Sequence, residues 1–214
     1  MKKMKKNVLL IVMAIFSLTV FSSEESYREE MKKNIKSIEK AKSINDFQGL
    51  ANKFERIAKA EKEKWLPYYY SAFCTINMSF FTKEKCDQYL DEAQKMIAEA
   101  NILSPNNSEI ETLQGYLYLG RIMRDPQTRG MKYSPMATAC FEKAKALNPN
   151  NPRPYYLLGQ NILHTPVQFG GGKAVACPIL TIALEKYNSF KPESEISPNW
   201  GKNQTKELSK KCSM

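Results

Sequence analysis

Two short turn segments, LSPNNS at residues 103–108 and LNPNNP at residues 147–152, are nearly the same, which points to an internal repeat. In each copy the same side chains lead up to the proline of the turn. An alanine is followed four positions later by a large apolar residue, three positions after that by a second alanine, and five positions further on by the proline itself. The two copies are Ala93, Ile97, Ala100, Pro105 and Ala137, Phe141, Ala144, Pro149. A chain built from such units buries its apolar residues by stacking one unit on the next.

Apolar residues recur at intervals of three and four along the chain beyond its first residues, whereas the alternation typical of strands is almost missing. This pattern predicts an all-α fold of about nine helices in antiparallel pairs. Ser197 as N-cap and Pro198 in the first helical position predict the start of the last helix, which would cap the stack. The expected helices lie near residues 27–38, 47–58, 65–80, 86–100, 108–123, 135–147, 153–164, 173–190 and 198–208.

The residue types of the repeat have physical reasons. Glycine and alanine are needed where the two helices of a hairpin cross closely, since a larger side chain would push the helices apart. The large apolar residue between the alanines, Phe141 in the second copy, is expected to fill the space between hairpins. The proline ends the second helix and fixes the entry to the next pair.

This arrangement resembles the tetratricopeptide repeat (TPR) family, across about residues 45–190 and most strongly over 89–184. The first half of the family pattern follows the prolines, with Tyr155, Leu158 and Gly159 in one copy and Gly115 and Tyr118 in the other. The resemblance implies a stack of helical hairpins, an α-solenoid. Three intervals are longer than in the family, namely 72–93, 115–137 and 159–176. The extra residues are expected in the loops inside each pair, so that they project from one edge of the stack.

The resemblance also implies a scaffold that binds a protein or peptide and carries no catalytic residues. In this family the first helix of each pair lines a concave face, where tyrosine rings beside polar side chains suit an extended peptide. The predicted lining consists of Tyr69, Phe73, Asn77, Thr112, Tyr116, Arg153, Tyr156, Gln160 and His164. Those in the two best-matched repeats, Tyr116, Tyr156 and Gln160, are expected to be partly exposed.

Three alternatives remain open at this point. Some of the lining rings, Phe73 above all, could pack between hairpins rather than face a partner. The concave face could hold a small solute or a lipid, as in a periplasmic carrier. The long loops could also carry a hydrolytic site that includes His164.

The first residues predict the compartment. Lys2, Lys3, Lys5 and Lys6 precede an uncharged run, residues 8–21, that is too short to cross a bilayer comfortably but fits a secretory signal peptide. We expect a signal peptide at residues 1–22 and a single repeat domain at 23–214. The mature protein is then exported, periplasmic or secreted, without stable membrane insertion.

Charge argues against a nucleic-acid protein. The whole chain carries a net charge of +10, and loss of the four leader lysines leaves 28 Lys and Arg against 22 Asp and Glu. The excess lies largely in the terminal stretches rather than among aromatics on one face, as a nucleic-acid interface would require.

Five cysteines, an odd number at wide spacing, do not form a disulfide framework. We expect mostly buried free thiols. If one bridge forms, Cys74 with Cys86 is favoured because these two flank one helix-to-helix connection. Without a CxxC pair, zinc and thioredoxin-like sites are not expected.

Catalytic and cofactor motifs are weak. His164 is the only histidine, is expected at a helix end, and has no metal-ligating neighbours in sequence. The segment FGGGKA, residues 169–174, lacks the Ser or Thr and the preceding strand of a phosphate-binding loop, so its glycines are expected to allow positive φ. We therefore expect no enzyme activity, no cofactor and no metal.

The leader makes the first testable prediction. The mature protein should begin at or near Ser23, because the basic, apolar and small-residue segments follow in signal-peptide order. Intact mass of the protein from the envelope fraction measures this directly, and a full-length chain held in the membrane would contradict it.

Overall fold

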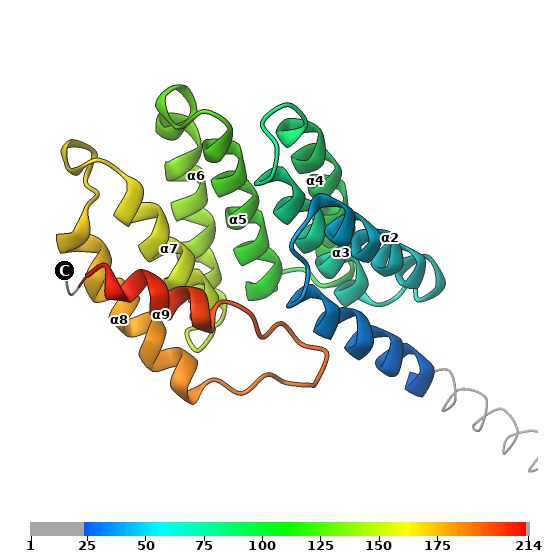
Figure 1. Cartoon of the computed structure of the whole chain (residues 1–214). Coiled ribbons are helices and arrows are strands. Elements are labelled where there is room, and N and C mark those ends of the chain that lie inside the picture. The colour runs from blue at the N-terminus through cyan, green and yellow to red at the C-terminus, as the bar shows by residue number, and fades with distance from the viewer. Residues whose placement is uncertain (1–23, 213–214) are drawn as a thin grey trace, which may run out of the picture.

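The computed structural model describes residues 24–212 and shows an all-α chain, which confirms the predicted fold class (Figure 1). Within these residues no strand is present. A first helix covers residues 24–38, and a short 3₁₀ turn, η1, covers Val167–Phe169. The other helices are α2 (Ile44–Ala60), α3 (Trp65–Ser79), α4 (Cys86–Leu103), α5 (Ser108–Arg124), α6 (Pro126–Leu147), α7 (Pro152–His164), α8 (Lys173–Ser189) and α9 (Lys202–Lys210).

The helices form antiparallel pairs that stack side by side, as the repeat predicts. The pairs α3–α4, α5–α6 and α7–α8 follow one another, and α4 contacts α5 as α6 contacts α7 (Figure 1). The first helices also touch from pair to pair, α3 with α5 and α5 with α7, and α9 packs on α8 as a cap. The TPR-like hairpin stack is therefore confirmed.

The repeated turns start the helices that follow them. Asn107 and Asn151 are N-caps, and their side chains accept hydrogen bonds from the backbone N–H groups of Glu109 (2.8 Å) and Arg153 (3.1 Å). The Asn151 amide also donates to the hydroxyl of Ser108 (3.0 Å), so the two turns are bonded to each other. The similarity of the two turns in sequence thus reflects a shared capping role.

Close helix crossings explain the small residues. A Cβ at Gly115 would overlap the ring of Phe141, and a Cβ at Gly159 would lie 2.7 Å from Leu180. Phe141 is fully buried, as expected, but its ring lies against α5 of its own pair and belongs to a core cluster that also draws on α7 and α8. The predicted need for glycine at these crossings is confirmed.

Two predicted helix starts are wrong. The helix expected from Pro135 begins at Pro126, where Asp125 caps it by accepting from the N–H of Thr128. The extra residues of this pair therefore lengthen the helices instead of forming a loop, and Pro135 lies inside α6. The last helix does not begin at Pro198, because the hydroxyl of Ser197 accepts from the N–H of Ser194 in a preceding turn.

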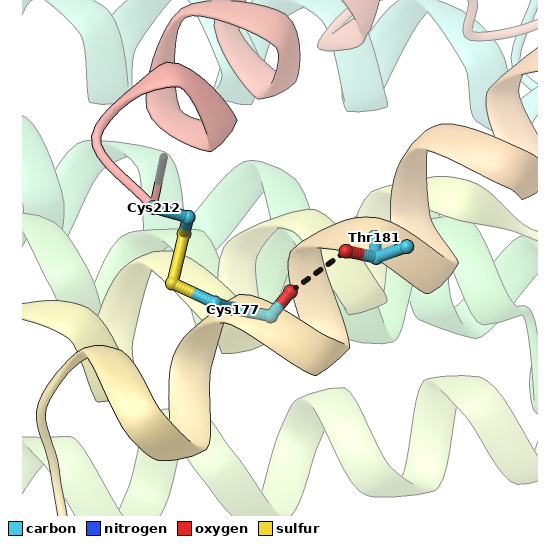
Figure 2. The surroundings of a disulfide bond; sticks show 3 residues. All are labelled: Cys177, Thr181 and Cys212. Carbon is cyan, nitrogen blue, oxygen red and sulfur yellow. Dashed lines mark hydrogen bonds between the residues drawn. A yellow bond between two sulfur atoms is a disulfide. The ribbon is translucent and has the colours of Figure 1, made fainter. Parts of the chain in front are cut away.

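The disulfide expectation is also wrong. Cys177 at the start of α8 is bonded to Cys212 just beyond α9, with an S–S distance of 2.07 Å (Figure 2). Cys74, Cys86 and Cys140 are free and buried, as expected for most of the thiols. The bridge joins two elements that are distant in sequence but adjacent in the fold, which spacing alone does not reveal. It ties the capping helix to the last hairpin.

The predicted signal peptide and its cleavage site lie outside the described residues. Among the described helices, none is both long enough and apolar enough to cross a membrane. The glycines of the FGGGKA segment behave as expected, since Gly170 has φ 81° and Gly172 has φ 96° in the connection between α7 and α8.

Phe141 provides the stability test of this architecture. Phe141→Ala should lower the free energy of unfolding by about 3–5 kcal/mol, since a fully buried ring is removed from a crossing that a glycine has shaped around it. Urea unfolding followed by circular dichroism measures the change, with the exposed Phe169→Ala as control. An unchanged unfolding midpoint for Phe141→Ala would contradict the register.

Candidate functional site

The predicted concave lining is largely buried. Tyr69, Thr112 and Arg153 have no exposed surface, and Phe73 and Tyr156 are exposed by only 8% and 9%. Asn77, Tyr116 and Gln160 are half-buried, and His164 is exposed at the end of α7. The expectation of partial exposure therefore holds for Tyr116 and Gln160 and is wrong for Tyr156.

The C-terminal segment between α8 and α9 covers this face. We call residues 190–201 the strap; Figure 1 shows it leaving α8, reaching across toward the N-terminal helices and returning to α9. The indole N–H of Trp200 donates to the hydroxyl of Tyr69 at 2.9 Å. The same ring packs on Phe73 and Tyr116, with centroids 4.9 and 5.8 Å apart. The aromatic part of the predicted lining is thus occupied by the chain itself.

Further bonds hold the middle of the strap and its C-terminal end. The hydroxyl of Tyr70 donates to the carbonyl of Ile196 at 3.0 Å, and Glu195 pairs with Lys32 of the first helix at 2.9 Å. The hydroxyl of Tyr187 on α8 donates to the carbonyl of Trp200, also at 2.9 Å. Ile196 is buried in the N-terminal core cluster. The strap therefore connects the first helices to the last hairpin.

The guanidinium of Arg153 is buried and paired with Glu109, so it is not exposed to a ligand. Its Nε donates to a carboxylate oxygen of Glu109 at 2.7 Å, and its guanidinium lies 4.6 Å above the ring of Phe190. A fully buried arginine needs such a charge partner, because an unpaired buried charge is costly. The sequence placed Arg153 correctly on the first helix of its pair but did not reveal Glu109 as its partner. Whether the lining residues bind a partner stays a prediction.

A second surface lies along one edge of the stack, where each pair turns from its first helix to its second. Figure 1 shows the α3–α4, α5–α6 and α7–α8 connections side by side along its upper edge. Several large apolar side chains are exposed near these connections. Single exposed apolar residues are common on protein surfaces, but a group of them along one edge indicates a binding surface. The exposed side chains are Phe80, Phe81, Met123, Met131, Val167 and Phe169. We call this surface the turn edge.

Two adjoining hollows open on the turn edge. The first has a volume of 280 Å³, and its lining includes Phe80, Phe81 and Met123. The second has a volume of 660 Å³ and is polar, with Gln127 and Arg129 in its lining. The two share Lys83 and Arg124. Together they place apolar walls and basic side chains next to each other.

Asp87 organises the arginines of this edge. Its carboxylate accepts from Arg129 at 2.7 Å and from Arg121 at 2.9 Å, and the Arg129 and Arg121 guanidiniums lower the pKa of Asp87 to about 2. Arg124 lies farther from this carboxylate, with Nε 4.0 Å from Oδ2. Arg121 and Arg129 are therefore committed to Asp87, whereas Arg124 and the exposed Lys83 present charge to the hollows.

The remaining reactive side chains, Cys86 and His164, each contact a backbone carbonyl. The thiol of Cys86 lines the first hollow, but it points to the carbonyl of Gly120 at 3.7 Å, and burial raises its pKa, which favours the neutral form. Nδ1 of His164 lies 2.8 Å from the carbonyl of Gln160, one helical turn back. Over residues 24–212, no three His, Cys, Asp or Glu side chains are grouped to hold a metal ion.

Known structures resemble the chain closely. It matches the HusA haemophore from Porphyromonas gingivalis with a TM-score of 0.81 and 32% identity, over 87% of this chain and 92% of that one. It also matches TTC0263, a thermophilic TPR protein of Thermus thermophilus, with a TM-score of 0.59 and 13% identity, over 76% and 75% of the two chains. The second likeness concerns the fold alone. No protein-family profile and no curated protein sequence matches the chain.

Trp200 tests how firmly the strap closes the concave face. Trp200→Ala should lower the free energy of unfolding by roughly 2 kcal/mol, less than for a fully buried ring, because the indole is only half-buried. It should also speed cleavage by a glutamate-specific protease after Glu193 and Glu195 in the released strap. Trp200→Phe, which keeps an aromatic ring, should lose less stability. Unchanged stability and cleavage in Trp200→Ala would show that the strap is held by other contacts.

Proposed function

The chain belongs to the same family as the HusA haemophore, and on this premise we propose that it is an exported carrier that binds a haem-type tetrapyrrole. The proposal replaces the protein or peptide expected from the repeat with a flat organic ligand, and it falls within the small-solute alternative. Export, as expected from the leader, would bring the protein to the surroundings in which a carrier meets its cargo.

One observation carries this proposal: the 32% identity spans 92% of the haemophore chain. Identity of this order over nearly the whole length relates the two chains as members of one family, beyond a shared hairpin stack. By contrast, the likeness to TTC0263, at 13% identity, carries no functional argument. The family relation therefore supports a class of ligand, whereas the TPR-like architecture alone would support only a binding scaffold.

The described surface has the chemistry that such a ligand needs. Haem is a flat apolar ring system with two carboxylates along one side. A site for it needs apolar walls that remove the ring from water and basic side chains that meet the carboxylates. The turn edge exposes Phe81 (49%) and Met123 (58%) next to Lys83 and Arg124.

We further propose that the protein works without catalysis. In support, the imidazole of His164, the only histidine of the chain, is engaged with a backbone carbonyl of its own helix rather than with a second reactive group. The Cys86 thiol is turned toward Gly120. Neither is arranged as the nucleophile–base pair that covalent catalysis requires.

Binding of a protein or peptide through the concave face remains a second candidate. One observation favours it: a non-helical segment of the chain, the strap, already lies on this face, with Trp200 against Phe73 and the Ile196 carbonyl bonded to Tyr70. A partner peptide would have to displace these contacts, so its net affinity would be reduced by the cost of releasing the strap. Recovery of a partner by pull-down, and its loss in Tyr116→Ala, Gln160→Ala with an unchanged circular dichroism melt, would support this candidate.

Titration with haemin tests the proposed function. The purified chain should shift the main haemin absorption band and quench tryptophan fluorescence, saturating with a Kd of about 1 μM or tighter. An unrelated tetratricopeptide-repeat domain of similar net charge is the control for nonspecific adsorption. Absence of saturable binding in this chain, or binding no tighter than to the control, would contradict the proposal.

A further inference from the structure

We propose that the tetrapyrrole binds in the hollows of the turn edge between the α3–α4 connection and the end of α5, rather than on the concave face. This assignment rests on the proposed function and adds a place and a binding mode to it. The ring system would lie against Phe80, Phe81 and Met123, and its carboxylates would meet Lys83 and Arg124.

The concave face is a less suitable site for the tetrapyrrole because the strap already occupies it. Trp200 already packs on Phe73 and Tyr116 and is bonded to Tyr69. A ligand there would have to remove an aromatic ring from its contacts and break the Tyr70–Ile196 bond before gaining any of its own. A ligand at the turn edge displaces only water from side chains that are already exposed.

The apolar walls of the hollow are held in place from behind. Phe80 packs on Tyr116 with ring centroids 5.4 Å apart, and Phe81 packs on Phe47 at 5.9 Å. Each exposed ring is thus fixed by an aromatic neighbour, so little conformational freedom is lost when a flat ligand binds. Met123, exposed by 58%, is flexible and can adapt to the ligand surface.

The basic side chains complete the match with a dicarboxylate. Lys83 and Arg124 line both hollows, so they stand at the boundary between the apolar wall and the polar space. Asp87 lies nearby, but its charge is compensated by Arg121 and Arg129. The volumes of 280 and 660 Å³ together fall within the roughly 300–1,000 Å³ usual for organic ligands.

Two other hollows have the wrong charge pattern. A hollow of 650 Å³ beside the strap has Glu193 and Lys191 in its lining, together with Glu109, whose charge is matched by Arg153, so it offers no excess of basic side chains to carboxylates. A hollow of 360 Å³ between the first helix and α2 sets Lys53 and Arg56 against two glutamates. At the turn edge, Asp125 is the one acidic side chain in the linings, against Lys83, Arg124 and Arg129, so basic charge is in excess beside the exposed apolar walls.

The first experiment removes the apolar wall. Phe81→Ala, Met123→Ala should weaken haemin binding by about tenfold or more, since truncating the central apolar contacts of a site commonly has this effect. Both side chains are about half exposed or more, so the circular dichroism melt should change little. Phe169→Ala, Val167→Ala is the matched control, because these residues are exposed on the same edge but belong to the α7–α8 connection. It should bind haemin as the unchanged chain does.

The second experiment separates the charges from the ring. Lys83→Gln, Arg124→Gln should weaken binding of protoporphyrin IX several-fold and reduce its dependence on salt. The same change should leave binding of the uncharged dimethyl ester of protoporphyrin IX nearly unaltered. Lys85→Gln, two residues from Lys83 and outside the lining of the hollow, is the control.

The possible outcomes distinguish failure of the site assignment from failure of the proposed function. If the unchanged chain binds haemin and both double variants bind it equally well, the site assignment is overturned while the proposed function stands. If Trp200→Ala alone changes haemin affinity, the ligand lies on the concave face and the assignment is again overturned. If the unchanged chain does not bind haemin or protoporphyrin at all, the proposed function fails and the site falls with it.

Discussion

Contact between the indole of Trp200 and the aromatic side chains of α3 and α5 determines what the remaining surface can do. The ring meets Phe73 and Tyr116 while its N–H reaches Tyr69, and it packs against both core clusters. A hairpin stack ordinarily leaves such a concave face open for a peptide. Here the chain supplies the occupant, held further by the bridge between Cys177 and Cys212 that ties α9 to α8.

Because the strap covers the concave face, we place the proposed ligand at the turn edge. Insertions within the pairs have built that edge: the α3–α4 connection presents Phe80 and Phe81, and the extension of α5 and α6 presents Met123 and the arginines around Asp87. The repeat positions serve the fold, whereas the residues that depart from the repeat form the proposed site. This separation is expected when function is added to a common scaffold.

The sequence was sufficient for the fold because its determinants are local. Apolar spacing, the asparagine caps and the Gly115 and Gly159 crossings each depend on residues within one or two helices. The strap was missed because its contacts join residues far apart in sequence, as in the bond from Trp200 to Tyr69. Ser197 and Pro198 match a helix start in sequence, but the Ser197 hydroxyl accepts from the N–H of Ser194 and the Trp200 indole is held by tertiary contacts, so α9 begins only at Lys202. The same reason explains the unpredicted Cys177–Cys212 bridge and the Arg153–Glu109 pair.

Hydrogen exchange of the backbone amides, followed with and without haemin, tests most directly where the ligand lies. The account predicts slower exchange on haemin binding around residues 80–86 and 121–129, with exchange across residues 195–201 unchanged. Faster exchange in the strap together with protection along α3 and α5 near Phe73 and Tyr116 would contradict it, since that pattern means that the ligand has displaced the strap from the concave face.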